Sequence, residues 1–118
     1  MLKNIMGIKI KYEFVDSDKD ETLVFLHGWG QSIDMMKPLG NNYFDVYNVL
    51  YVDLPGFGNS SEPDYSWTVY DYAKCINILV TDLKLNNIVI IGHSFGGRVG
   101  LIYSSKYNIN KLVCLNNN

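Results

Sequence analysis

The clearest chemical signal in the sequence is the run GHSFGG at residues 92–97, which contains the pattern G-x-S-x-G around Ser94. It directly follows a short apolar run at residues 87–91 and precedes a predicted helix over residues 95–107. A serine on a sharp strand-to-helix turn presents its hydroxyl as a nucleophile, and small residues such as Gly92 and Gly96 keep side chains out of that crowded turn. The pattern alone would arise by chance in roughly one chain in twenty of this length. The flanking strand and helix therefore favour a nucleophilic Ser94 over a glycine-rich turn that positions nothing.

A second signal is the run His27-Gly28-Trp29-Gly30, which directly follows the apolar residues 22–26. A sharp turn there can aim a backbone N–H at the same point as the N–H of Phe95. Two such donors form an oxyanion hole, which stabilises the charge that develops in the transition state of acyl transfer. The alternative is an ordinary glycine turn with a hydrogen-bonded histidine.

A third signal is the loop DLPGFGNS at residues 53–60, which follows a predicted strand over residues 46–52. Its proline and glycines predict a compact turn at the carboxyl end of that strand, where open α/β sheets place their functional sites. For Asp53 we expect a structural role, accepting hydrogen bonds, rather than a catalytic one.

The elements that must position these loops alternate between strand and helix. Residues 8–14 alternate apolar and charged side chains, which predicts a strand with one solvated face near an antiparallel edge, paired with residues 2–6 across Gly7. The runs at 22–26, 87–91 and 111–115 are continuously apolar, which is typical of strands covered on both faces. The sequence therefore predicts an α/β fold of about six strands, with a mostly parallel sheet and helices on both faces.

Three helices are expected between these strands. Thr68 and Asp71 form the pattern of a helix N-terminus, and apolar residues then recur at helical spacing up to Leu83. Residues 95–107 form the helix after the Ser94 turn. A short helix is predicted over residues 32–37, ended by Pro38 because proline breaks the hydrogen-bond ladder of a helix.

Composition excludes several classes of protein. The chain of 118 residues has a formal net charge of −2 and no basic stripe, so we expect neither nucleic acid nor an anionic membrane as a partner. It contains no apolar run long enough to span a membrane and no ligand cluster for a metal, and we expect no cofactor. The two cysteines, Cys75 and Cys114, lie in apolar runs and are expected to be buried, reduced thiols of a cytoplasmic protein.

In this order the three motifs resemble the α/β-hydrolase superfamily, in its group of esterase-like and C–C-hydrolase-like serine enzymes. The resemblance implies that residues 1–118 are the N-terminal part of a single α/β-hydrolase domain, with Ser94 as the nucleophile and the N–H groups of Phe95 and Trp29 as the oxyanion hole. Because the nucleophile position holds serine rather than aspartate, the dehalogenase and epoxide-hydrolase branches are disfavoured. The residues expected to support the site are His27, Gly28, Gly30, Asp53, Gly92, His93, Gly96 and Gly97.

The base that would activate Ser94 is missing from the sequence. In this superfamily an acid and then a histidine follow the serine, but the 24 residues after Ser94 contain no Asp, Glu or His. We expect neither His27 nor His93 to act as the base. The expectation is therefore a fragment with little activity of its own, whose last strand, over residues 111–115, is an exposed apolar edge open to self-association.

Three functional hypotheses follow. The first is a hydrolase acting on an ester or related acyl bond of a small molecule, with the base supplied by residues beyond Asn118. The second is a non-catalytic truncated product or binding module that pairs through its edge strand. The third is acyl transfer, perhydrolysis or C–C bond cleavage on the same fold, since a fold does not choose among these reactions.

Overall fold

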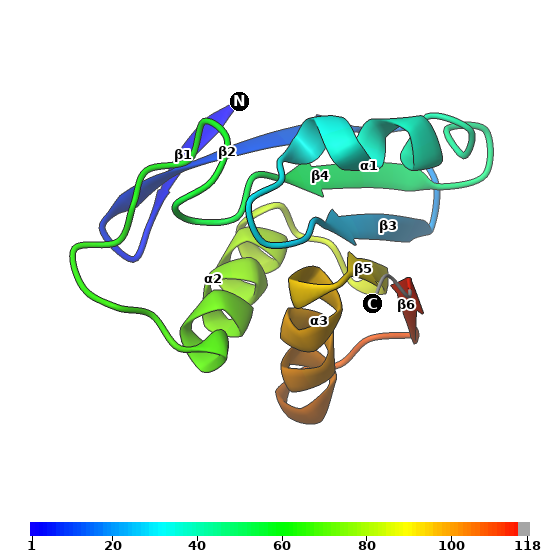
Figure 1. Ribbon diagram of the computed structural model, residues 1–118. Helices are drawn as coiled ribbons and strands as arrows, with labels where there is room; N and C mark the ends of the chain where they lie inside the picture. Colours follow the sequence, from blue (N-terminus) through cyan, green and yellow to red (C-terminus); the bar gives the residue numbers. More distant parts are fainter. Residues whose placement is uncertain (116–118) are drawn as a thin grey trace.

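The computed structural model describes residues 1–115, which form one mixed sheet flanked by helices (Figure 1). In chain order the elements are β1 (Leu2–Ile5), β2 (Ile8–Val15), β3 (Glu21–Leu26), α1 (Ile33–Gly40), β4 (Asn48–Val52), α2 (Val69–Asp82), β5 (Asn87–His93), α3 (Phe95–Lys106) and β6 (Lys111–Leu115). The strand order across the sheet is β1-β2-β4-β3-β5-β6.

The sheet is antiparallel at one side and parallel elsewhere. β1 and β2 form a hairpin through the turn at Met6 and Gly7, both of which have positive φ angles, and β2 pairs antiparallel with β4. β4, β3, β5 and β6 all run parallel. This arrangement confirms the predicted hairpin, the antiparallel edge and the mostly parallel sheet.

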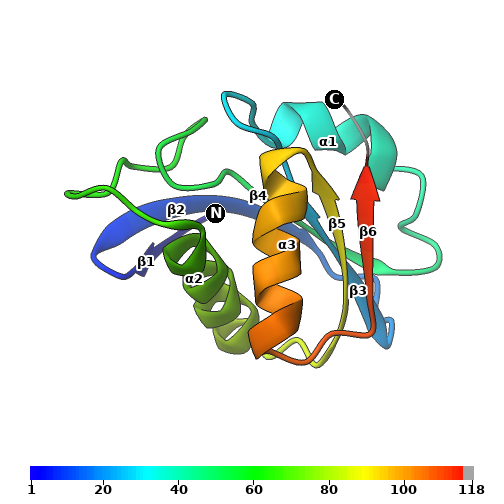
Figure 2. The same cartoon turned by 60° about the horizontal axis from the view of Figure 1, so that its bottom comes forward.

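Helices cover both faces of the sheet, as predicted. α2 and α3 lie side by side on one face, where they bury alternate residues of the central strands such as Val24, Leu26 and Ile90 (Figures 1 and 2). α1 packs on the other face against the intervening residues, including Phe25 and Tyr51. Each central strand is thus buried on both sides, which is why its sequence is continuously apolar rather than alternating.

The prediction for α1 was wrong at its C-terminus. The helix does not end before Pro38 but continues through it to Gly40. Proline removes one N–H, whose helical partner would be the carbonyl of Asp34, and Asp34 is exposed so that water can satisfy this carbonyl. Burial of Met36 and Gly40 against the sheet favours continuing the helix past the missing bond.

The other predicted elements are confirmed, with small shifts at their ends. α2 begins with the expected capping box, in which the backbone N–H of Thr68 donates to the Asp71 carboxylate at 2.8 Å. β5 extends two residues beyond the apolar run, to His93. The fourth strand is shorter than expected because it begins at Asn48, whose side chain bonds the loop before β3.

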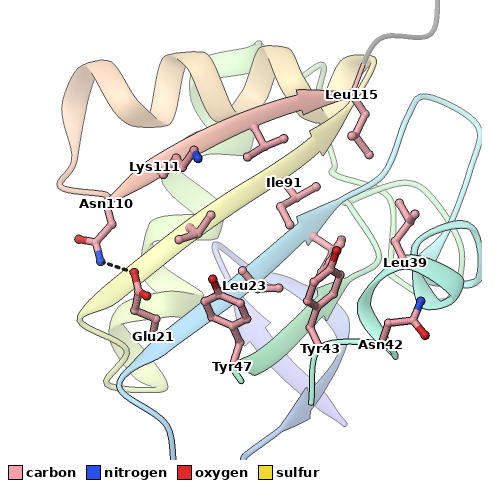
Figure 3. A pocket seen from close by; sticks show the side chains of 13 residues that line it. Glu21, Leu23, Leu39, Asn42, Tyr43, Tyr47, Ile91, Asn110, Lys111 and Leu115 are labelled. Carbon is pink, nitrogen blue, oxygen red and sulfur yellow. Dashed lines mark hydrogen bonds between the residues drawn. The ribbon is translucent and has the colours of Figure 1, made fainter. Parts of the chain in front are cut away.

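One face of the sheet is only partly covered. Beside α1, a groove of about 610 Å³ runs over β3, β5 and β6 (Figure 3). Its floor carries Ile91, Val113 and Leu115, which are buried only in part, and Asn110 and Glu21 are hydrogen-bonded at one end of it. The apolar surface expected at the last strand is therefore present.

Both cysteines were predicted to be buried, which is confirmed for Cys75 and wrong for Cys114. Cys75 is fully buried in α2, but Cys114 on β6 is exposed, and both thiols are free. β6 is the edge strand of the sheet within residues 1–115, and Gly97 of α3, which faces the sulfur, has no side chain to cover it.

Candidate active site

Ser94 occupies a strained turn between β5 and α3. Its φ and ψ angles are 59° and −115°, and φ is positive although the residue is not glycine. Such a conformation costs about 1–3 kcal/mol and persists only where the surroundings impose it, typically at functional sites. Ser94 is exposed, and its hydroxyl does not cap α3, so the side chain remains free for a ligand.

The glycines around Ser94 are required by space rather than by backbone angles. A Cβ on Gly92 would lie 2.5 Å from the carbonyl oxygen of Gly96, and a Cβ on Gly96 would overlap the carbonyl oxygen of Leu26. Neither glycine has a positive φ angle. Gly97 is different, because its Cβ would lie at ordinary contact distances of 3.4 Å and more. The contact between Gly96 and Leu26 brings the Ser94 turn directly against the end of β3.

The turn after β3 holds the N–H of Trp29 in a defined direction. The carbonyl oxygen of Gly28 accepts hydrogen bonds from His27 Nδ1 at 2.7 Å and from the backbone N–H of Gln31 at 3.1 Å. The peptide bonds of the described residues are trans, so the N–H of Trp29 points away from these two donors. Within residues 1–115 this N–H donates no hydrogen bond.

The N–H of Phe95 is oriented in the same way. The carbonyl oxygen of Ser94 accepts from the N–H groups of Gly97 and Arg98, at 2.9 and 3.2 Å. The Phe95 N–H of the same trans peptide therefore points out of the N-terminus of α3, where the helix dipole favours negative charge. In the described part of the chain it is also without an acceptor.

These two N–H groups come from neighbouring turns at one end of the sheet. Figure 2 shows the loop between β3 and α1 at the same end as the start of α3. The rings of Trp29 and Phe95 meet edge to face with centroids 5.1 Å apart. Trp29 also packs edge-on against Phe57 at 4.7 Å, so the loop after β4 joins the same group.

His27 is a structural histidine. It is fully buried; its Nδ1 donates to Gly28 O, and its Nε2 accepts the backbone N–H of Leu54 at 2.9 Å. These partners fix the neutral tautomer with the proton on Nδ1. Desolvation by burial lowers the pKa of His27, against the opposing effects of the Gly28 hydrogen bond and the charge of Asp53. With both ring nitrogens engaged, His27 joins two loops and has no nitrogen free to accept a proton from Ser94.

Both carboxylate oxygens of Asp53 accept hydrogen bonds from backbone N–H groups. Oδ1 accepts the N–H of Ile33, the first residue of α1, at 2.7 Å, and Oδ2 accepts the N–H of Asn59 at 2.9 Å. Ser60 Oγ donates to the Asp53 carbonyl oxygen at 2.5 Å. A Cβ at Gly58 would overlap the carboxylate, which accounts for the glycine there. Asp53 thus organises the loop that borders the site.

Gln31 is a residue that the sequence reasoning missed. Its Oε1 accepts the backbone N–H of Gly28 at 2.8 Å and lies 3.0 Å from Nδ1 of His93. The contact connects residues 62 positions apart, and a glutamine in a loop gives no signal of it in the sequence. Gly30, by contrast, is exposed with φ of 76°, so its role is to allow the turn.

A series of aromatic rings includes Phe95, the residue that follows Ser94. Trp67, Tyr72, Phe95, Trp29 and Phe57 form a continuous series of edge-to-face contacts. A groove of about 430 Å³ lies between Trp29 and the loop that follows β4. The larger groove on the opposite face of the sheet is lined by neither Ser94 nor Trp29.

Among residues 1–115, His, Cys, Asp and Glu side chains do not gather in threes as a metal site requires, and no helix is long and apolar enough to cross a membrane.

Comparison with known proteins agrees with this geometry. The family model described as alpha/beta hydrolase fold matches residues 21–117. The chain belongs to this family. It is 36% identical to pimeloyl-[acyl-carrier protein] methyl ester esterase of Shewanella woodyi, over 74% of this chain and 31% of that protein.

Two solved structures extend the comparison. An esterase from Exiguobacterium antarcticum superposes with a TM-score of 0.87 at 28% identity, and the epoxide hydrolase CorEH with a TM-score of 0.88 at 26% identity. The matches cover 97% and 98% of this chain but only 44% and 41% of those proteins. The chain spans less than half the length of the curated relatives it matches. These relatives are hydrolases of several kinds, so the fold alone does not choose the reaction.

Proposed function

We propose that this chain is part of a serine hydrolase that acts on an ester or related acyl bond, with Ser94 as the nucleophile. The observation that carries the proposal is the exposed, strained Ser94 at φ 59°, followed by Phe95, whose ring packs against Trp29. The backbone N–H groups of Phe95 and Trp29 have no acceptor within residues 1–115. A turn that served only to connect β5 and α3 would have no need of this strain.

The proposed reaction begins with attack of Ser94 Oγ on the substrate carbonyl carbon. The Oγ proton passes to a base, the carbonyl π electrons move to oxygen, and the resulting oxyanion accepts hydrogen bonds from the N–H groups of Phe95 and Trp29. Collapse of this intermediate expels the alcohol, which takes up the proton, and leaves an acyl-serine for water to hydrolyse. Loss of one such donor typically costs about 10²–10³ in kcat.

We propose that neither histidine of the chain is the base in this reaction. His27 uses both ring nitrogens within the fold. His93 bonds Gln31 through Nδ1, and within residues 1–115 its ring forms no hydrogen bond with Ser94. We therefore propose that residues outside these 118 supply the base and its orienting acid, and that the 118-residue chain alone turns over substrate very slowly.

The substrate we propose is a small molecule with an apolar group. The groove beside Trp29 is lined in part by aromatic side chains, and the ring of Phe95, which directly follows Ser94, packs against Trp29. These aromatic surfaces favour an aliphatic or aromatic acyl or alcohol part. The similarity to two esterases supports an ester as the reacting group.

The test is labelling by a fluorophosphonate probe, which reacts with an activated serine. We expect the native protein, purified from its own cells, to be labelled at Ser94 and its Ser94→Ala variant to remain unlabelled. The recombinant 118-residue chain should be labelled far more slowly than the native protein. An unlabelled native protein would refute the proposal and leave a non-catalytic binding role as the better hypothesis.

For the isolated chain we also propose self-association through β6. This strand has a free edge within residues 1–115, and its Val113 and Leu115 face the uncovered groove (Figures 2 and 3). Sedimentation velocity should show concentration-dependent dimers or larger species, which Val113→Lys abolishes. The control is Leu101→Lys, which changes an apolar side chain on α3 that is more exposed than Val113 and should leave association unchanged. A chain that is monomeric at all concentrations would refute this proposal.

A further inference from the structure

We propose that Gln31 is a positioning residue that locks the turn carrying the Trp29 N–H to the turn carrying Ser94. This inference rests on the proposed function, because it concerns how the oxyanion donor and the nucleophile are held in register. The contacts that carry it can be tested without any catalytic activity.

Gln31 forms hydrogen bonds with both backbone polar groups of Gly28, its N–H and its carbonyl oxygen. The side-chain oxygen of Gln31 accepts the Gly28 N–H at 2.8 Å, and the backbone N–H of Gln31 donates to the Gly28 carbonyl oxygen at 3.1 Å. The plane of the following peptide is thereby fixed, and with it the direction of the Trp29 N–H.

The same side-chain oxygen reaches the Ser94 turn. His93, which precedes Ser94, has its Nδ1 at 3.0 Å from Gln31 Oε1. A carboxamide oxygen can only accept, so Nδ1 of His93 must carry the proton and the neutral ring leaves Nε2 bare. One acceptor atom thus receives one hydrogen bond from each turn.

The Gln31 amide lies against Gly28, where a side chain would not fit. A Cβ on Gly28 would lie 2.8 Å from Gln31 Oε1 and 3.1 Å from His93 Nδ1. Glycine at position 28 therefore makes space for the amide between the two turns. Because Gly96 packs on the end of β3 as well, Ser94 and Trp29 are held on two sides of one rigid junction.

Two variants separate the hydrogen bonds from the volume of the side chain. Gln31→Met keeps the length of the side chain and removes the acceptor, whereas Gln31→Glu keeps an acceptor oxygen at the same reach. Gln31 is the only glutamine in the chain, and His27 and His93 are its only histidines, so the NMR signals are few.

The first experiment is long-range ¹H–¹⁵N NMR of the imidazole rings of the 118-residue chain at pH 8, where unperturbed imidazoles are neutral. We expect His93 to be the Nδ1–H tautomer in the wild type and in Gln31→Glu, and a mixture of tautomers in Gln31→Met. Hydrogen exchange of the Gly28 amide should accelerate about tenfold in Gln31→Met only. An unchanged tautomer and unchanged Gly28 exchange in Gln31→Met would overturn the inference.

The second experiment tests positioning in the native protein. Gln31→Met should slow labelling of Ser94 by the fluorophosphonate probe about ten- to hundredfold, because small displacements of reacting groups are costly. Labelling at the wild-type rate would overturn the positioning role. If wild-type Ser94 is not labelled at all, the proposed function fails, and the NMR result still decides whether Gln31 joins the two turns.

Discussion

Replacing Gly96 by alanine is the sharpest test of how the Ser94 turn is built. The added Cβ would overlap the carbonyl oxygen of Leu26 and lie 2.7 Å from that of His27. Both neighbours are backbone atoms at the end of a central strand, so they cannot rotate aside as a side chain would. α3 would have to move away from the sheet to accommodate the methyl group.

The size of the effect follows from two opposing contributions. Alanine is favoured over glycine inside a helix by about 1 kcal/mol, whereas overpacking a tight core costs about 1–3 kcal/mol and more where the backbone must shift. Because the neighbours are backbone atoms, we expect the upper end of this cost, and so a net loss of about 2 kcal/mol in the free energy of unfolding of Gly96→Ala. The neighbouring Gly97→Ala is the matched control, because its Cβ would meet Gly92 O at 3.4 Å and Cys114 Sγ at 3.6 Å. For this control we expect a gain of up to about 1 kcal/mol from helix propensity.

Urea unfolding followed by circular dichroism measures the difference. With an m-value of about 2 kcal/mol/M, the midpoints of the two variants should differ by about 1–1.5 M. Gly100→Ala should fall between them, because its Cβ would meet the end of the Leu112 side chain at 2.7 Å, which can move. Equal midpoints for Gly96→Ala and Gly97→Ala would refute the argument that space selects the glycine.

Three further predictions concern other residues. Burial lowers the pKa of His27, so the neutral His27 ring should contribute fully to stability above pH 6.5. This contribution should be lost as the pH falls through the folded-state pKa. The drop in urea midpoint from pH 8 to pH 5 should therefore be smaller in His27→Gln than in the wild type. Burial raises the pKa of the Cys75 thiol to about 12, so Ellman's reagent at pH 8 should titrate one thiol, Cys114, in the folded chain and two in urea; two fast thiols without urea would contradict the burial. Asp53→Asn keeps only one of the two acceptors that bind backbone N–H groups, and should lower the free energy of unfolding by about 1–3 kcal/mol; an unchanged urea midpoint would contradict it.

Much of the fold could be read from the sequence because it depends on local patterns. Continuous apolar runs identify strands buried on both faces, and the alternation in β2 identifies the strand near the antiparallel edge. The Thr68–Asp71 capping box marks the start of α2 because its hydrogen bonds involve residues three apart. The order of the three glycine-containing loops along the chain likewise resembles the family.

Only the tertiary structure decides the features that depend on contacts between distant parts of the chain. That α1 continues through Pro38 follows from packing on the sheet, and that Cys114 is exposed follows from its place on the edge strand. Gln31 contacts His93 at the end of β5, 62 residues away, and no local pattern encodes this contact. Sequence periodicity reports the sterics and burial of a single element, whereas these features depend on which elements meet and how much space remains between them.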